Sequence, residues 1–212
     1  YKEAIKNIKK YLGNDVKIII MLRNPIYRAY SAYSFASRTH QENQEFHQAL
    51  INNQKRYDED ETLSPMILYK ELGLYYRMVK AYIDSFKDVH VILYDDFILE
   101  TDLEVKKVFD FLDLNSCHKI DTSQIINSGG KKWDSRFAKD FLMGKGFIKS
   151  FSRLFFPSQL RVNMKAILIK IFTSKAADMD EEVKRELLNY YQDDIELLEQ
   201  LINKDLRKWK KI

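Results

Sequence analysis

The residues with the clearest chemical potential are two hydrogen-bond donors in one short segment near the N-terminus. Arg23 offers a planar guanidinium that matches a phosphate, and Ser31, eight residues later, adds a hydroxyl. Asn24 and Pro25 favour a helix start, because Asn caps helices and Pro tolerates the first helical position. Backbone N–H groups at such a start attract anions. The segment therefore predicts an anion site with Arg23 and Ser31 as its side-chain donors.

A buried strand would position these donors. Residues 16–22 form an apolar run rich in β-branched side chains, which is typical of a parallel strand covered on both faces. Arg23 follows the run directly and so stands at the carboxyl end of the strand, where α/β sheets bind ligands. Arg28 is a further cation nearby. Taken singly, each residue is better explained as a solvated charge or a packing hydroxyl, but their joint occurrence here favours a site.

The rest of the chain alternates predicted helices and strands. We expect helices over residues 2–12, with Gly13 as the stop, over 25–38 and around 46–50. Three more are expected: one that begins at Ser64-Pro65 and runs to 86, one that begins at a Thr101/Glu104 capping box, and one that begins at Asp178 with Glu181 and runs to 206. A second strand is expected over residues 89–94. Strands separated by helical crossovers predict an α/β fold with a central parallel sheet and helices on both sides.

The segment LRNPIYRAYSAY, residues 22–33, resembles the 3′-phosphate-binding element of sulfotransferases that use 3′-phosphoadenosine 5′-phosphosulfate (PAPS). Other segments resemble the same family, so that the resemblance covers nearly the whole chain: residues 73–86, 91–97, 109–114 and 205–209. It implies a P-loop-NTPase-like three-layer sandwich in which Arg23 and Ser31 hold the 3′-phosphate. It also implies that Tyr94 approaches the adenine, although a strand-end aromatic packed under a loop explains Tyr94 equally well.

A second stretch that could bind a polyanion lies at residues 127–137. Gly130 allows backbone N–H groups to approach a ligand closely, while Lys131 and Lys132 supply positive charge. The stretch resembles, in its place along the chain, a late basic loop of the sulfotransferases near the nucleotide phosphates. A solvated surface turn is the alternative.

The family's 5′-phosphosulfate loop, a Lys-x-Gly-Thr-type turn, has no counterpart in this sequence. Only fifteen residues precede Val16, whereas that loop stands many tens of residues before the Arg-Asn-Pro element in the family. We interpret residues 1–212 as a single sulfotransferase-like domain that forms the C-terminal portion of a longer protein. A natural protein that has lost the catalytic loop is the alternative.

No residue is assigned as the catalytic base. His40 and Glu42 lie beyond the helix that carries Ser31 and could border an acceptor cleft, while His90, inside an apolar strand, is interpreted as structural. Asp95 and Asp96 are interpreted as turn and cap residues. No cluster of His, Cys, Asp or Glu has metal-ligand spacing, so no metal is expected.

Composition bounds the partners and the compartment. The single cysteine, Cys117, excludes an internal disulfide, and the absence of a signal-like start makes the cytoplasm the default expectation. A net charge of +4 suits an anionic ligand, and no nucleic acid partner is predicted. Residues 141–177 carry seven Lys or Arg and no acidic residue among many apolar side chains, which fits peripheral contact with an anionic membrane or a glycan. A core segment with a solvated basic face is slightly favoured.

The sequence therefore predicts a sulfotransferase that moves a sulfuryl group from PAPS to a hydroxyl or amine of a glycan or other small acceptor. A non-catalytic nucleotide- or glycan-binding module derived from the same fold is one alternative. A P-loop kinase relative is another, and preference for a 3′-phosphorylated adenosine over ATP separates it from a sulfotransferase.

Overall fold

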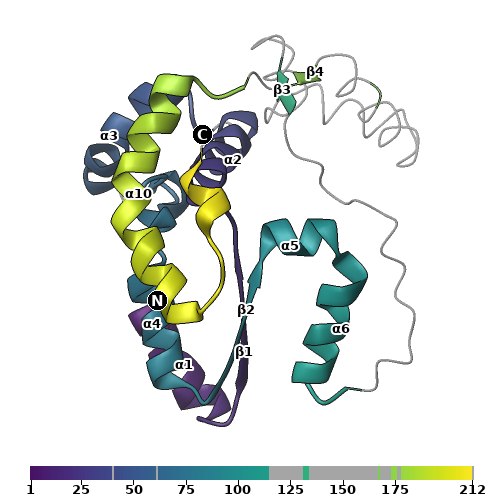
Figure 1. Cartoon of the computed structure of the whole chain (residues 1–212). Helices are drawn as coiled ribbons and strands as arrows, with labels where there is room; N and C mark the ends of the chain where they lie inside the picture. Colours follow the sequence, from purple (N-terminus) through teal and green to yellow (C-terminus); the bar gives the residue numbers. More distant parts are fainter. Residues whose placement is uncertain are drawn as a thin grey trace, which may run out of the picture. The chain divides into compact units, whose positions relative to one another are not determined.

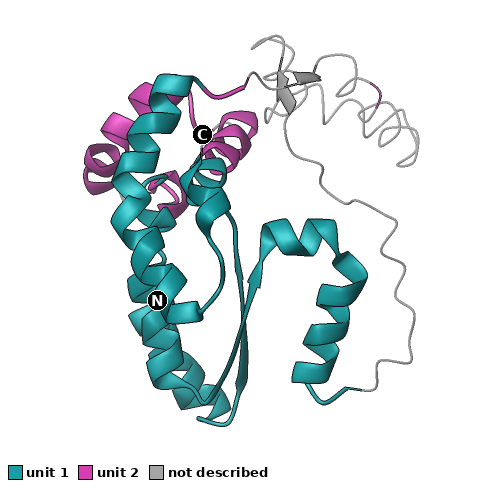
Figure 2. Cartoon of the chain, viewed as in Figure 1, with its two compact units in different colours: residues 1–29, 69–127, 180–212 teal, residues 30–68, 128–179 magenta. Residues whose placement is uncertain are grey.

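The structure is a computed structural model that describes residues 1–39, 41–60, 62–114, 131–133, 167, 173–175 and 178–211. Its contacts divide the chain into two compact units, coloured separately in Figure 2. Unit 1 comprises residues 1–29, 69–127 and 180–212, and unit 2 comprises residues 30–68 and 128–179. That residues 1–212 form a single domain stays a prediction.

Unit 1 is an α/β assembly around a pair of parallel strands. Strands β1 (Lys17–Leu22) and β2 (Asp88–Leu93) pair in a register that runs from Lys17 opposite Asp88 to Leu22 opposite Leu93. Figure 1 shows helices on both sides of this pair. On one side lie α1 (Lys2–Leu12), α4 (Tyr76–Ser85) and α10 (Glu181–Ile202), and on the other α5 (Tyr94–Leu99) and α6 (Thr101–Phe111). The predicted parallel α/β arrangement is confirmed.

The core of unit 1 draws on α10 and on the two strands. One stripe of α10 is buried at helical spacing and belongs to the face that meets α4: Val183, Leu187, Tyr191, Ile195 and Leu198. From the strands, Leu22, Ile92 and Leu93 are also buried. The described part of unit 1 also contains two 3₁₀ turns, η2 (Glu71–Gly73) and η3 (Arg207–Lys210). The apolar stripe expected on the last long helix is therefore confirmed.

Local sequence signals located some helix ends correctly. The first helix spans Lys2–Leu12 as predicted, and Gly13 follows it with a φ of 87°, a left-handed value that favours glycine. Helix α2 spans Pro25–Arg38, again as predicted, beginning in unit 1 and continuing into unit 2.

The prediction that a helix begins at Ser64-Pro65 was wrong. Ser64 caps only a 3₁₀ turn, η1 (Pro65–Ile67), by accepting from the Met66 N–H at 3.3 Å. Helix α4 begins at Tyr76, and its cap is Asp194 of α10, which accepts the backbone N–H groups of Tyr75 at 2.7 Å and Tyr76 at 3.1 Å. A cap supplied by a distant element has no local sequence signature.

Two other predicted helix caps were also wrong. Thr101 forms no capping box with Glu104, because its hydroxyl donates to the Phe97 carbonyl at 2.7 Å and Glu104 pairs with Lys107. Helix α10 is capped by Asp180, two residues after the predicted Asp178, and Asp180 accepts from the Glu182 N–H at 2.7 Å.

Gly73 stands where the backbone approaches Tyr191 of α10 closely. A Cβ atom at Gly73 would lie 2.6 Å from the Tyr191 hydroxyl oxygen and 2.7 Å from its ring. The buried ring cannot move freely, because its hydroxyl donates to the Lys70 carbonyl at 2.9 Å.

We therefore expect Gly73→Ala to lower the free energy of unfolding by about 1–3 kcal/mol, the usual effect of overpacking. Urea denaturation followed by circular dichroism measures it. An unchanged free energy of unfolding would show that the Tyr191 ring can move to accommodate a methyl group without a loss of stability.

Unit 2 contains the second part of α2, helix α3 (Phe46–Glu59), the turn η1 and an antiparallel pair, β3 (Lys131–Trp133) with β4 (Thr173–Lys175). Rings from α2 and α3 pack together, with the centroids of Tyr30 and Tyr33 each 5.0 Å from that of Phe46. The helix expected around 46–50 is confirmed. In the part of the chain that the structure describes, no helix combines the length and apolar character needed to cross a membrane.

Candidate nucleotide-binding site

Two of the predicted ligand residues meet at the carboxyl end of the parallel strands. Arg23 follows β1 directly, and Tyr94 follows β2 as the first residue of α5. Because Leu22 pairs with Leu93, the two side chains leave the sheet at one edge. The carbon at the centre of the Arg23 guanidinium lies 5.0 Å from the centroid of the Tyr94 ring, a cation–π contact.

The backbone of Arg23 is fixed by a buried tyrosine. The Tyr75 hydroxyl donates a hydrogen bond to the Arg23 carbonyl at 2.9 Å. Burial raises the pKa of Tyr75 to about 12, so its hydroxyl stays protonated and able to donate at neutral pH. The hydrogen bond from Tyr75 thus fixes the position of the backbone from which the Arg23 side chain extends.

The guanidinium of Arg23 keeps its donors available. Within the described ranges of the chain, Arg23 makes no side-chain hydrogen bond or ion pair, and its contact is with the face of Tyr94. Arg28, the other cation considered in this segment, is used internally, because it donates through Nη2 to the Tyr69 carbonyl. Arg23 is therefore the better candidate for holding an anion, and Arg28 serves the fold.

The start of α2 is only partly available to a ligand. Asn24 is buried, and its side-chain oxygen accepts from the Ile26 N–H at 3.0 Å, which confirms the predicted cap. That N–H is satisfied within the chain, and Pro25 has none to offer. An anion at this edge must therefore be bound mainly by the Arg23 side chain, and less by the backbone N–H groups at the start of α2 than the sequence predicted.

Ser31 lies in α2 and is half-buried, and its hydroxyl has no hydrogen-bond partner among the described residues. It belongs to unit 2, whereas Arg23 belongs to unit 1, so the convergence of the two side chains stays a prediction. Lys131 and Lys132 lie in β3 of unit 2, and Gly130 lies outside the described residues. Their contact with the nucleotide also stays a prediction.

Two residues that support the site were missed by sequence reasoning. They are Tyr75 and Trp209, to which no local pattern assigns a role. Trp209 donates its indole N–H to Asp95 at 2.8 Å, and its ring meets that of Tyr75 edge-on with centroids 6.3 Å apart. The available signal was their place in two family-like segments, residues 73–86 and 205–209.

The acceptor-side candidates do not yield a catalytic base. Glu42 is buried and binds Arg56 at 2.8 Å, while it also accepts the backbone N–H groups of Asn43 and Gln44. This arrangement gives Glu42 a structural role in unit 2. His40 lies outside the described residues, as do Cys117 and most of residues 141–177. His90 stacks on Phe111 with centroids 5.2 Å apart, and burial lowers its pKa, which fits a packing role.

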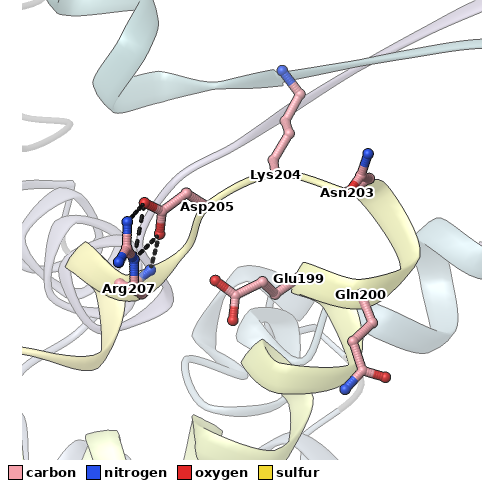
Figure 3. Close-up of a pocket in the computed structure, with 6 residues that line it drawn as sticks. All are labelled: Glu199, Gln200, Asn203, Lys204, Asp205 and Arg207. Carbon is pink, nitrogen blue, oxygen red and sulfur yellow. Dashed lines mark hydrogen bonds and ion pairs between the residues drawn. The ribbon is translucent and has the colours of Figure 1, made fainter.

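The described residues hold no group of three or more His, Cys, Asp or Glu that could bind a metal ion. They do form an open pocket at the C-terminal end of α10, shown in Figure 3, lined by Glu199, Gln200, Asn203, Lys204, Asp205 and Arg207. Its two carboxylates are already paired, with Asp205 bound to Arg207 at 2.6 Å and Glu199 to Lys210 at 2.6 Å. This pocket adds no candidate ligand site.

Comparison with known proteins assigns the chain to a family. The family model for the sulfotransferase domain matches residues 5–200. No curated protein matches the sequence. Among solved structures, the crystal structure of a sulfotransferase from Alicyclobacillus acidocaldarius is similar, with a TM-score of 0.67 and 25% identity. The similarity covers 98% of this chain and 62% of that one, so this chain spans less than two thirds of the other's length. The P-loop-like α/β fold expected from the sequence is confirmed, and the chain belongs to the sulfotransferase domain family.

Proposed function

We propose that this chain serves a sulfotransferase that uses PAPS as its co-substrate and a hydroxyl or amine of a glycan or other small molecule as its acceptor. The carboxyl ends of β1 and β2 would bind the 3′-phosphate side of the nucleotide. Membership of the sulfotransferase domain family supports the reaction class. The observation that supports the site is the Arg23 guanidinium, which lies on Tyr94 at this edge without a described hydrogen-bond or ion-pair partner.

The residues at this edge fit such a nucleotide. A guanidinium with unused donors forms charge-assisted, bidentate hydrogen bonds with a phosphate. An aromatic ring beside it offers an apolar face to a purine. Arg23 supplies the first feature, Tyr94 the second, and both come from strand ends that the sheet holds in register.

Each residue has a separate part in this proposal. Arg23 and Ser31 would hold the 3′-phosphate, Tyr94 would lie beside the adenine, and Gly130 with Lys131 and Lys132 would lie near the nucleotide phosphates. The bound co-substrate supplies the sulfuryl group, which leaves the 5′-phosphate as the acceptor oxygen or nitrogen bonds to sulfur. A cytoplasmic location, the absence of a nucleic acid partner and contact of residues 141–177 with a membrane surface stay predictions.

Nucleotide selectivity tests the binding part. We expect the chain to bind 3′-phosphoadenosine 5′-phosphate at least about tenfold more tightly than adenosine 5′-phosphate, because the 3′-phosphate adds charge-assisted contacts of about 1.5–3 kcal/mol. Isothermal titration calorimetry with these two nucleotides and ATP measures the difference. Tighter binding of ATP would contradict the proposal and favour the kinase alternative.

Transfer of labelled sulfuryl from PAPS tests the enzymatic part. The acceptors should include glycans with free hydroxyls and with free amines, and label in any of them supports the sulfotransferase. Binding of 3′-phosphoadenosine 5′-phosphate by this chain without label in any acceptor would favour a non-catalytic module for these residues, in which the 5′-phosphosulfate loop has no counterpart.

A further inference from the structure

We propose that Trp209 is a positioning residue for the nucleotide site at the ends of β1 and β2. One route runs from Trp209 through Tyr75 to Arg23, and the other runs through Asp95 to Tyr94. This inference rests on the proposed function, because binding of the nucleotide is the property that the positioning serves.

Trp209 is fixed near the C-terminal end of the described chain. It lies in η3 and is only 2% exposed. Glu199 of α10 fixes this turn at both ends, because its carboxylate accepts hydrogen bonds from the Leu206 N–H at 2.8 Å and from the Lys210 ammonium at 2.6 Å. The indole therefore occupies a defined place against the core of unit 1.

The first route fixes the backbone of the anion-binding residue. The indole meets the Tyr75 ring edge-on, with an angle of 61° between the ring planes. Tyr75 is held at its backbone by Asp194 of α10 and at its other end donates to the Arg23 carbonyl. Removing the indole would release one side of the ring that holds Arg23 in place.

The second route fixes the aromatic partner of Arg23. The indole N–H donates to the Asp95 carboxylate in the first turn of α5. Asp95 follows Tyr94 directly, and the Tyr94 ring lies against the Arg23 guanidinium. One side chain thus contacts the neighbours of both members of the cation–π pair, and its N–H is the specific link to one of them.

The substitution Trp209→Phe tests this role, because Phe keeps an aromatic ring but lacks the N–H. We expect the dissociation constant for 3′-phosphoadenosine 5′-phosphate to rise about three- to tenfold, the usual effect of one lost hydrogen bond. In a Tyr94→Ala background the same substitution should have almost no further effect, because the lost N–H acts through Asp95 on Tyr94. Calorimetry of the four proteins gives both results.

Two further comparisons separate positioning from a merely structural effect. Asp95→Asn keeps an oxygen acceptor for the indole and should retain near-normal affinity, whereas Asp95→Leu should match Trp209→Phe. Phe86→Leu removes volume at a buried ring that makes no described contact with the site, so it should lower the melting temperature and leave affinity unchanged.

The outcomes distinguish this inference from the proposed function. Unchanged affinity in folded Trp209→Phe, or additive effects with Tyr94→Ala, would overturn the positioning role alone. Failure of the unaltered chain to bind 3′-phosphoadenosine 5′-phosphate would overturn the proposed function, and the positioning role with it.

Discussion

Arg23→Ala is expected to weaken binding of 3′-phosphoadenosine 5′-phosphate by about 10- to 150-fold, which corresponds to about 1.5–3 kcal/mol. Arg23 is the cation that the structure leaves without a described hydrogen-bond or ion-pair partner at the carboxyl end of β1. The substitution removes every charge-assisted bond from that guanidinium to the 3′-phosphate. Isothermal titration calorimetry measures the change, and Arg23→Lys should give an intermediate loss because it keeps the charge without the planar donors.

A matched control separates this contact from the loss of one positive charge. Arg185 is an exposed arginine on α10, for which the described residues show no ion pair. Arg185→Ala lowers the net charge by the same amount and should change affinity by less than about twofold at 0.15 M salt, where distant charges are screened. Equal losses in Arg23→Ala and Arg185→Ala would show that Arg23 makes no direct contact with the phosphate.

Arg56→Met is expected to lower the free energy of unfolding by about 2–3 kcal/mol. The Glu42 side chain is 0% exposed, and both of its oxygens accept from Arg56, at 2.8 and 3.0 Å. Removing Arg56 takes a hydrogen-bonded cation away from a buried carboxylate, a loss of about 3–5 kcal/mol for a fully buried pair. Arg56 is 21% exposed, so water replaces part of the interaction and the expected value lies at the low end.

Denaturation by guanidinium chloride measures this effect, with Lys55→Met as the control. Lys55 precedes Arg56 on α3 and pairs with Glu59, but its side chain is 76% exposed, so its removal should change stability by less than about 0.5 kcal/mol. The double variant Glu42→Gln with Arg56→Met should recover part of the loss, because no charge is then left buried. A loss in Arg56→Met no larger than that in Lys55→Met would rule out a structural role for the pair.

Features that depend on a few adjacent residues could be predicted from the sequence. The apolar run at 16–22 predicted the position of β1, and Asn24 with Pro25 predicted the start of α2, because strand propensity and helix capping act over short distances. The prediction that this strand is covered on both faces was wrong, because Ile19 and Met21 are 41% and 47% exposed and only Leu22 is buried. The same logic placed Arg23 and Tyr94 at two strand ends. Parallel pairing then brought them to one edge of the sheet.

Features that depend on distant residues could not be predicted in this way. The cap of α4 comes from Asp194, 118 residues beyond Tyr76, and the indole that supports the site reaches Asp95 across 114 residues. No local pattern records such pairs. Tyr75 and Trp209 lie in segments that resemble the sulfotransferase family, but that resemblance does not predict which residues they contact.

A crystal structure of the chain with 3′-phosphoadenosine 5′-phosphate tests the central claim most directly. We predict that one 3′-phosphate accepts hydrogen bonds from both the Arg23 guanidinium and the Ser31 hydroxyl, at about 2.7–3.2 Å. A nucleotide bound elsewhere, or a 3′-phosphate that contacts neither of these side chains, would contradict the account.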